Sequence, residues 1–266
     1  MIGSQPMELA AHHGQGAPGF CASIPTSFSS IEEARNSLAY NASQCTIILE
    51  SPDKYSERAP YLQMLTKWGS AVDAFESQNS LSARSIQAIR LLQVNQRFIE
   101  MSFAVPPTSI THRETDWDLH LEDCKEIVSL ASEALQTSPD ALDGVQQRPS
   151  FCFDGVLVGP LFAVGHKCRD PFVRREAARL LKKYPRQEGI WDSVLAGRVV
   201  DKLISLEEQG LGTVEKSQDV PDCARLNEVQ VTFDIEGRLG TIWYKRRLGS
   251  PLTGTLIRQF KDHIKW

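Results

Sequence analysis

The chain has 266 residues, of which 41% are hydrophobic and 23% charged, and it carries a net charge of −4. This composition is ordinary for a globular protein, and the acidic balance argues against nucleic-acid binding over the whole surface. No apolar stretch reaches the roughly 20 residues of a membrane-spanning helix. Residues 1–27 lack the basic start and apolar centre of a secretory signal, so we expect a mobile lead-in. The expected location is the nucleus or cytoplasm, without secretion.

Four amphipathic helices are predicted in the first half of the chain. Ser30 and Glu33 form a capping box at the start of the first helix. Each helix then presents apolar side chains at helical spacing. A polar stretch containing prolines and a glycine follows the fourth helix and predicts a loop at about residues 136–150. The predicted helices cover about residues 31–49, 59–78, 81–103 and 114–135.

Three further helices with short joints are predicted in the second half. After a largely apolar helix, Asp170 supplies an N-cap and Pro171 the first helical position. The next helix buries Val173, Ala177, Leu180 and Leu181, and its arginines and lysines, including Arg174, take the solvated surface. Pro185 ends this helix. The last helix is predicted from about Ile190, with Trp191 on its buried face, to about Gly210.

A β-hairpin is predicted near the C-terminus, because apolar and polar residues alternate at 229–233 and β-branched and aromatic residues fill 241–245. No fixed period supports a repeat protein. The predicted fold is therefore mainly α, a multi-helix bundle of antiparallel helical hairpins with a small C-terminal β-hairpin. The predicted division is a lead-in at 1–27, a helical domain at 28–210, and a loop, hairpin and tail at 211–266.

Several motifs of the second half occur in a fixed order. They are Phe151-Cys152-Phe153-Asp154, Lys167-Cys168-Arg169-Asp170-Pro171, Arg174-Arg175 with two alanines, and Pro185-Arg186-Gln187-Glu188-Gly189-Ile190-Trp191. This order resembles the C-terminal regulatory, or effector, region of the fungal Zn(2)-Cys(6) binuclear-cluster transcription regulators. The resemblance extends over most of residues 28–247 and is most specific between Lys167 and Trp191.

The resemblance implies a nuclear regulator linked to a metabolic or secondary-metabolite pathway. Its implied partners are other proteins, full-length regulator relatives among them, and a small-molecule effector. The chain lacks the close cysteine pairs of a zinc cluster, however, because its nearest cysteines, Cys152 and Cys168, are 16 positions apart. We therefore expect neither a metal nor another cofactor, and no sequence-specific DNA binding by this chain alone. The alternative is a helical enzyme or small-molecule-binding protein of such a pathway that reuses the regulator scaffold.

Four groups of side chains are candidates for a functional site. Asp116, His120 and Asp123 share a helix face and could bind a metal, but a solvated face is favoured. His166 and Cys168 could form a catalytic pair, but a packed joint is favoured. The basic helix could bind phosphate, but internal salt bridges are favoured. Residues 244–247 could be a nuclear-import patch.

The sequence contains no recognised catalytic motif, which favours a protein that is not an enzyme but does not exclude an enzyme. The residues expected to form a structural or interaction motif are Lys167, Cys168, Arg169, Asp170, Pro171, Arg174, Arg175, Pro185, Arg186, Glu188, Gly189 and Trp191.

Overall fold

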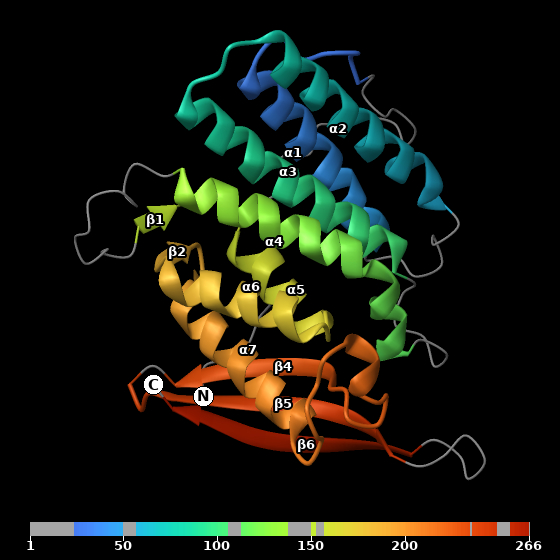
Figure 1. Cartoon of the computed structure of the whole chain (residues 1–266), viewed down its shortest axis with the longest axis vertical. Helices are drawn as coiled ribbons and strands as arrows, with labels where there is room; N and C mark the ends of the chain where they lie inside the picture. Colours follow the sequence, from blue (N-terminus) through green and yellow to red (C-terminus); the bar gives the residue numbers. More distant parts are fainter. Residues whose placement is uncertain are drawn as a thin grey trace.

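The computed structural model of the protein shows a mainly α-helical molecule with a β-sheet at its C-terminal end, as predicted (Figure 1). Within the part of the chain that the structure describes, no helix combines the length and the apolar character needed to cross a membrane. Most of the predicted lead-in and most of the predicted loop at 136–150 lie outside the described residues. The structure describes residues 24–49, 57–105, 113–137, 150–152, 157–234, 236–248 and 256–265.

The first three helices form one end of the molecule and pack around Trp68 (Figure 1). The Trp68 ring is buried, and its Nε1 donates a hydrogen bond to the Ala34 carbonyl at 3.0 Å. At the start of the first helix, the Ser30 hydroxyl accepts from the Glu33 N–H at 3.1 Å, as predicted. The Glu33 carboxylate reaches back one residue further than expected, to the Ser29 N–H at 2.8 Å. The helices are α1 (Ile31–Leu49), α2 (Ala59–Gln78) and α3 (Ala83–Ala104).

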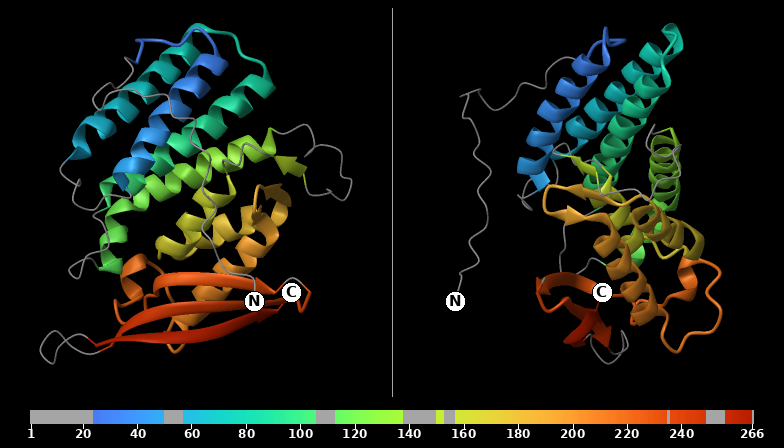
Figure 2. Two further views of the ribbon diagram at one scale, coloured as in Figure 1. Left: turned by 180° about the vertical axis from the view of Figure 1, so that it is seen from behind. Right: turned by 90° about the vertical axis from the view of Figure 1, so that its left-hand side faces the viewer.

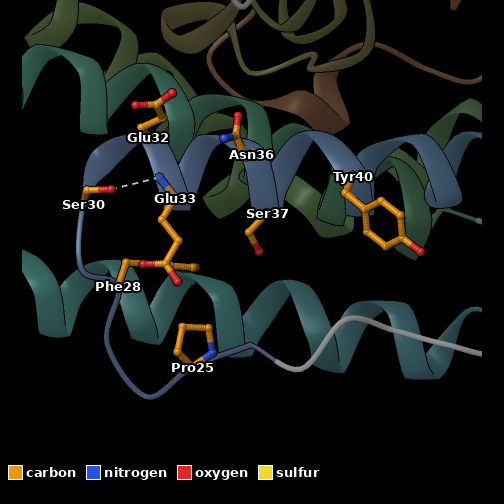
Figure 3. Close-up of a pocket in the computed structure, with 8 residues that line it drawn as sticks. All are labelled: Pro25, Phe28, Ser30, Glu32, Glu33, Asn36, Ser37 and Tyr40. Carbon is orange, nitrogen blue, oxygen red and sulfur yellow. Dashed lines mark hydrogen bonds between the residues drawn. The ribbon is translucent and has the colours of Figure 1, made fainter.

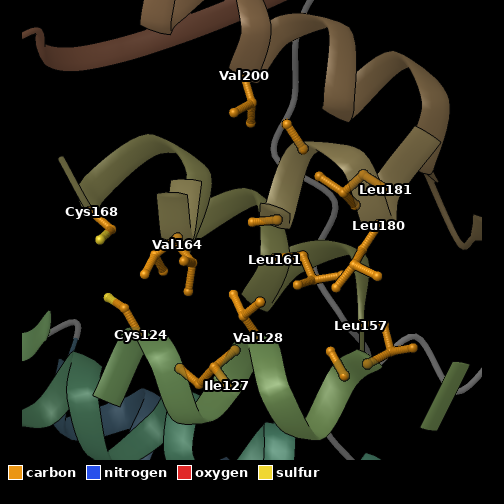
Figure 4. Close-up of a cluster of buried hydrophobic side chains, with 14 of the residues drawn as sticks. Cys124, Ile127, Val128, Leu157, Leu161, Val164, Cys168, Leu180, Leu181 and Val200 are labelled. Atoms are coloured by element: carbon orange, nitrogen blue, oxygen red, sulfur yellow. The ribbon is translucent and has the colours of Figure 1, made fainter. Parts of the chain in front are cut away.

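The middle of the molecule contains a second core, built by α4 and the three helices after it (Figure 4). The helix predicted at 114–135 begins as a 3-10 turn and becomes α-helical only at Leu121. The α5 and α7 backbones approach closely at Gly165, where an added Cβ would lie 2.7 Å from the Val200 side chain. The elements are η2 (Glu114–His120), α4 (Leu121–Gln136), α5 (Val158–Lys167), α6 (Pro171–Lys183) and α7 (Ser193–Glu208).

The predicted start of α6 is confirmed. The Asp170 carboxylate accepts hydrogen bonds from the backbone N–H groups of Phe172 at 3.1 Å and Val173 at 3.0 Å, and Pro171 occupies the first turn. These bonds satisfy two of the four N–H groups that a helix start leaves without a partner. Asp170 therefore fixes where the chain turns from α5 into α6.

The prediction for the start of α7 is wrong by three residues. Instead of starting a helix, Gly189 and Ile190 form a tight turn before Trp191, and Gly189 has a φ of +55°, a conformation that favours glycine. The short strands β2 (Arg186–Glu188) and β3 (Trp191–Asp192) pair across this turn, and the β1 backbone (Ser150–Cys152) pairs in parallel with β2. The helix begins only after Asp192, whose carboxylate accepts from the Leu195 N–H at 2.7 Å.

The predicted β-hairpin is confirmed and extended by a third strand that the sequence analysis did not identify. Its first two strands pair in an antiparallel manner, with Val231 opposite Ile242. One face of the sheet packs on α7, where Leu203 and Tyr244 share a core cluster. Figure 2 shows the sheet at the end of the molecule opposite α1–α3. The strand order is β4 (Asn227–Asp234), β5 (Leu239–Leu248), β6 (Leu256–Lys265), and the single-turn η4 (Ser217–Asp219) precedes them.

Candidate functional site

The predicted Lys167–Trp191 motif divides into two structural features. Its first half joins a network of buried charges that we call the buried ion cluster. Its second half forms one wall of a surface cleft that we call the Trp191 cleft. The buried ion cluster consists of Glu114, Asp118, Lys167, Arg169, Arg174, Glu207 and Arg225.

Arg169 is the centre of the buried ion cluster and has no exposed side-chain surface. Its Nη2 donates to Glu207 at 2.7 Å, and its Nη1 donates to Glu114 at 2.9 Å and to the Lys167 carbonyl at 2.7 Å. A guanidinium group taken from water needs this number of partners, because an unpaired buried charge is strongly destabilising. Arg169 therefore ties the α5–α6 joint to η2 and to the end of α7.

Glu207 is the main anion of the cluster. It lies 2.8 Å from Arg174 and accepts from the Leu226 N–H at 2.8 Å, in addition to its bonds with Arg169. Burial by itself raises the pKa of Glu207, but attraction to the two arginines outweighs burial and lowers the pKa to about 2. The pKa of Glu114 is lowered in the same way, against its burial, by Lys167 and Arg169. Both acids are therefore ionised at neutral pH.

The structure corrects the placement of Arg174. The helical pattern put it on the solvated face of α6, whereas its side chain is fully buried and paired with Glu207. Its Nε and Nη1 make no hydrogen bond within the described part of the chain. The favoured interpretation of the basic helix, internal salt bridges, is confirmed for its surface, where Arg175 pairs with Glu208 and Arg179 with Glu176.

Arg225 forms a second arm of the cluster that sequence reasoning missed. Both of its terminal nitrogens donate to the Asp118 carboxylate, each at 2.8 Å, and its Nε donates to the Val220 carbonyl at 2.8 Å. Two further bonds reach the Glu114 carbonyl at 3.0 Å and the Ser217 carbonyl at 2.9 Å. The sequence shows only an arginine before the predicted hairpin. Its burial could not be predicted from local patterns, because its partner Asp118 lies 107 positions earlier.

The turn between Pro185 and Trp191 is held by buried polar contacts. The Glu188 carboxylate accepts from the N–H groups of Leu157 at 3.1 Å and Val158 at 2.8 Å, so it caps the start of α5. The Arg186 N–H donates to the Ser193 hydroxyl at 2.9 Å. These bonds fix the turn to both neighbouring helices and support the expectation of a structural motif here.

The prediction that Trp191 lies in the core is wrong. Because α7 starts only after Asp192, Trp191 lies on the β3 strand and is 41% exposed. Its ring packs on Phe162 of α5, with 5.4 Å between the ring centroids. The neighbouring Ile190 is 85% exposed, and Phe233 on β4 is 43% exposed. The turn thus presents large apolar side chains to the surface.

These side chains line the Trp191 cleft, which has a volume of about 640 Å³. One wall is formed by α5, the turn and the first half of α7, and the other by the apolar side of β4. Within the described part of the chain, the polar residues of the lining are Gln187 and Asp192. The other lining residues are Phe162, Ile190, Trp191, Leu195, Ala196, Val199, Val229, Val231 and Phe233.

A second hollow lies beside the first turns of α1 and has a volume of about 500 Å³ (Figure 3). It includes Pro25, Phe28, Tyr40 and several polar residues of the helix. Its Glu33 carboxylate is already bonded to the backbone and hydroxyl of Ser29, at 2.8 and 2.7 Å. The carboxylate of Glu33 is therefore already used in capping α1.

The remaining candidates are explained by local structure. His166 packs on Phe162, with ring centroids 6.0 Å apart, and Cys168 contacts Cys124 of α4 (Figure 4), which agrees with a packed joint. Burial first, and then the neighbouring Lys167, Arg169 and Arg174, hold the pKa of His166 well below its usual value.

Each of the three candidate metal ligands has a local partner in the structure. His120 Nδ1 lies 3.0 Å from the Asp123 carboxylate, whereas Asp116 accepts from the Arg113 N–H at 3.0 Å. Among the described residues, no group of three or more histidine, cysteine, aspartate or glutamate side chains is arranged to hold a metal ion.

The basic stretch at 244–247 belongs to strand β5. Tyr244 is buried, Lys245 pairs with Glu228, and Arg246 donates to the Leu206 carbonyl at 2.6 Å.

Comparisons of the chain with protein-family models, with curated proteins and with solved structures found no match.

Proposed function

We propose that the protein is a regulator-like binding module, similar to the effector region of fungal zinc-cluster transcription regulators but without their DNA-binding zinc cluster. The Trp191 cleft carries this proposal. Its exposed wall is built by the same Pro185–Trp191 turn that carries the sequence resemblance. An apolar, aromatic-rich hollow on the surface of a globular protein is typical of a binding site.

The buried ion cluster supports binding rather than catalysis. Strongly shifted pKa values often mark catalytic groups, but ion-pair networks shift them as well. Here the shifted acids Glu114 and Glu207 are saturated by arginine, lysine and backbone partners. Neither acid lines the Trp191 cleft. The cluster therefore has a structural role, in which it ties the α5–α6 joint to η2, to the end of α7 and to Leu226.

In this proposal the protein acts in the nucleus on the genes of a metabolic or secondary-metabolite pathway. Its partners are other proteins, including full-length regulators that supply the DNA-binding zinc cluster. A second candidate function is a small-molecule-binding protein or enzyme of such a pathway. The volume of the Trp191 cleft favours this candidate, because sites for small molecules typically measure about 300–1,000 Å³.

A transcription reporter tests the regulator proposal. The full chain is fused to a heterologous DNA-binding domain in a fungal cell, and reporter transcription is compared with that of the DNA-binding domain alone. We expect the fusion to change transcription and Trp191→Ala to remove the change. The matched control is Phe172→Ala, which alters a 76% exposed aromatic residue outside the cleft. A wild-type fusion without effect on the reporter contradicts the regulator proposal.

A further inference from the structure

We propose that the Trp191 cleft binds a small, planar, apolar molecule that is neutral or positively charged. This inference rests on the proposed function, because it names the effector class for the same site. It concerns binding to the purified chain, however, and is testable without any transcription assay.

The size and lining of the cleft indicate a small molecule. The volume of about 640 Å³ lies in the usual range for such sites, and nine of the eleven lining residues are apolar. Three of the nine are aromatic, Phe162 on α5, Trp191 on β3 and Phe233 on β4. Aromatic rings contributed by three separate elements favour a flat ligand, because offset or edge-to-face ring contacts add to the gain from apolar burial.

The cleft is held in shape by contacts that do not involve a ligand. On one side, Asp192 caps α7, and the Gln187 side chain donates to the Gly189 carbonyl at 2.9 Å. On the other side, β4 pairs with β5 from Gln230 to Asp234 and again at Asn227, with an irregularity between Asn227 and Gln230. A preformed cleft loses little conformational freedom when it is occupied, which favours affinity for a small molecule.

The charge of the lining decides between ligand classes. Among the described residues that line the cleft, Asp192 is the only ionisable one, and no lysine, arginine or histidine joins it. The Asp192 carboxylate also occupies the N-terminus of α7, where the helix dipole would otherwise attract an anion. An acidic ligand therefore meets repulsion without a compensating cation. An amine, in contrast, gains from the carboxylate and from the faces of the aromatic rings.

Two dyes with the same ring system form a direct test. N-phenyl-1-naphthylamine is neutral, and 8-anilinonaphthalene-1-sulfonate adds one negative charge to the same skeleton. Both are titrated into the purified full chain at low salt, with dye fluorescence as the readout. We expect the neutral dye to bind more tightly by at least about threefold, the effect of one charge roughly 6 Å away in a water-exposed site.

Three variants locate the binding. Trp191→Ala removes the aromatic ring that the turn contributes to the cleft and should abolish the signal of the neutral dye. Asp192→Asn should reduce the difference in affinity between the two dyes. Because asparagine is also a good N-cap, α7 should remain folded. Val231→Glu should block the cleft, whereas Gln230→Glu on the neighbouring, exposed position of β4 should leave binding unchanged. Far-ultraviolet circular dichroism checks the fold of each variant.

Each outcome decides the proposal. The proposal is supported if the neutral dye binds in a Trp191-dependent manner and the sulfonate dye binds more weakly. Equal binding of the two dyes, or binding that survives Trp191→Ala in a folded protein, overturns it. Absence of dye binding, with Trp191-dependent self-association in sedimentation instead, also overturns it and makes a second copy the occupant. A failed dye test with an active reporter fusion refutes only this inference, whereas dye binding with an inactive fusion refutes only the regulator proposal.

Discussion

Glu207→Gln should be among the most destabilising single substitutions in the second half of the chain. The carboxylate accepts from Arg169, Arg174 and the Leu226 N–H, and its side chain is only 1% exposed. Glutamine removes the negative charge and leaves two buried guanidinium groups facing an amide. Breaking a buried pair in this way costs about 3–5 kcal/mol. The lowered pKa of Glu207 has the same cause, because these contacts favour the ionised carboxylate over the neutral one.

The next residue in the chain is a matched control. Glu208 pairs with Arg175, whose side chain is 48% exposed, so Glu208→Gln should cost less than about 1 kcal/mol. Urea unfolding at pH 7, followed by circular dichroism, gives the free energy of unfolding of both variants. If Glu207→Gln costs no more than Glu208→Gln, the buried ion cluster does not stabilise the fold and the reasoning is refuted.

The same carboxylate gives the wild-type protein a defined pH dependence. Because the folded-state pKa of Glu207 is lowered, its contribution is fully present above the unfolded value of 4.5 and is lost as the pH falls toward about 2. Glu207→Gln should lack this part of the acid destabilisation. The measurement is the free energy of unfolding of both proteins between pH 6 and pH 3. Parallel curves for the two proteins are inconsistent with this assignment.

Four further results are expected. His166→Leu should flatten the loss of stability as the pH falls below 6.5, because the unfolded state takes up a proton that the buried imidazole resists; identical pH profiles would contradict this. Gly165→Ala should cost about 1–3 kcal/mol in urea unfolding, since its Cβ meets Val200, whereas Gly159→Ala on the same helix has free space and should cost nothing. Trp191→Ala should cost less than the about 3–5 kcal/mol of a core tryptophan, because the ring is 41% exposed; a full loss would place it in the core. Elemental analysis of the purified chain should find no stoichiometric zinc, and two retained ions per chain would overturn that expectation.

Local patterns in the sequence were sufficient to predict most helices and the first two strands of the C-terminal sheet. The Asp170-Pro171 start of α6 was correct because capping depends on residues three or fewer positions apart. Strand β6 was missed because apolar and polar residues do not alternate regularly along it. It begins with two adjacent apolar residues, Leu256 and Ile257, both of which are exposed. Its position is decided by pairing with β5, which no local pattern reveals.

The two errors in the motif have related physical causes. Arg174 was assigned to solvent because arginine is costly to bury, and the acid that compensates it, Glu207, is 33 positions away. Trp191 was assigned to the core because its spacing fits the face of α7. The glycine turn and the Asp192 cap start that helix later and leave the ring outside it. Helical periodicity therefore failed for Arg174 because of a long-range ion pair, and for Trp191 because of a backbone turn and a helix cap.

The long reach of Arg225 also constrains when the protein can fold. It bonds to Asp118, 107 positions earlier, and to the Glu114 carbonyl, 111 positions earlier. Contacts between such distant segments form late, because the loop between them must close first. During synthesis, Asp118 and Glu114 leave the ribosome long before Arg225 does. The Arg225 arm of the buried ion cluster can therefore form only after residue 225 has left the ribosome, and until then Asp118 depends on water for compensation.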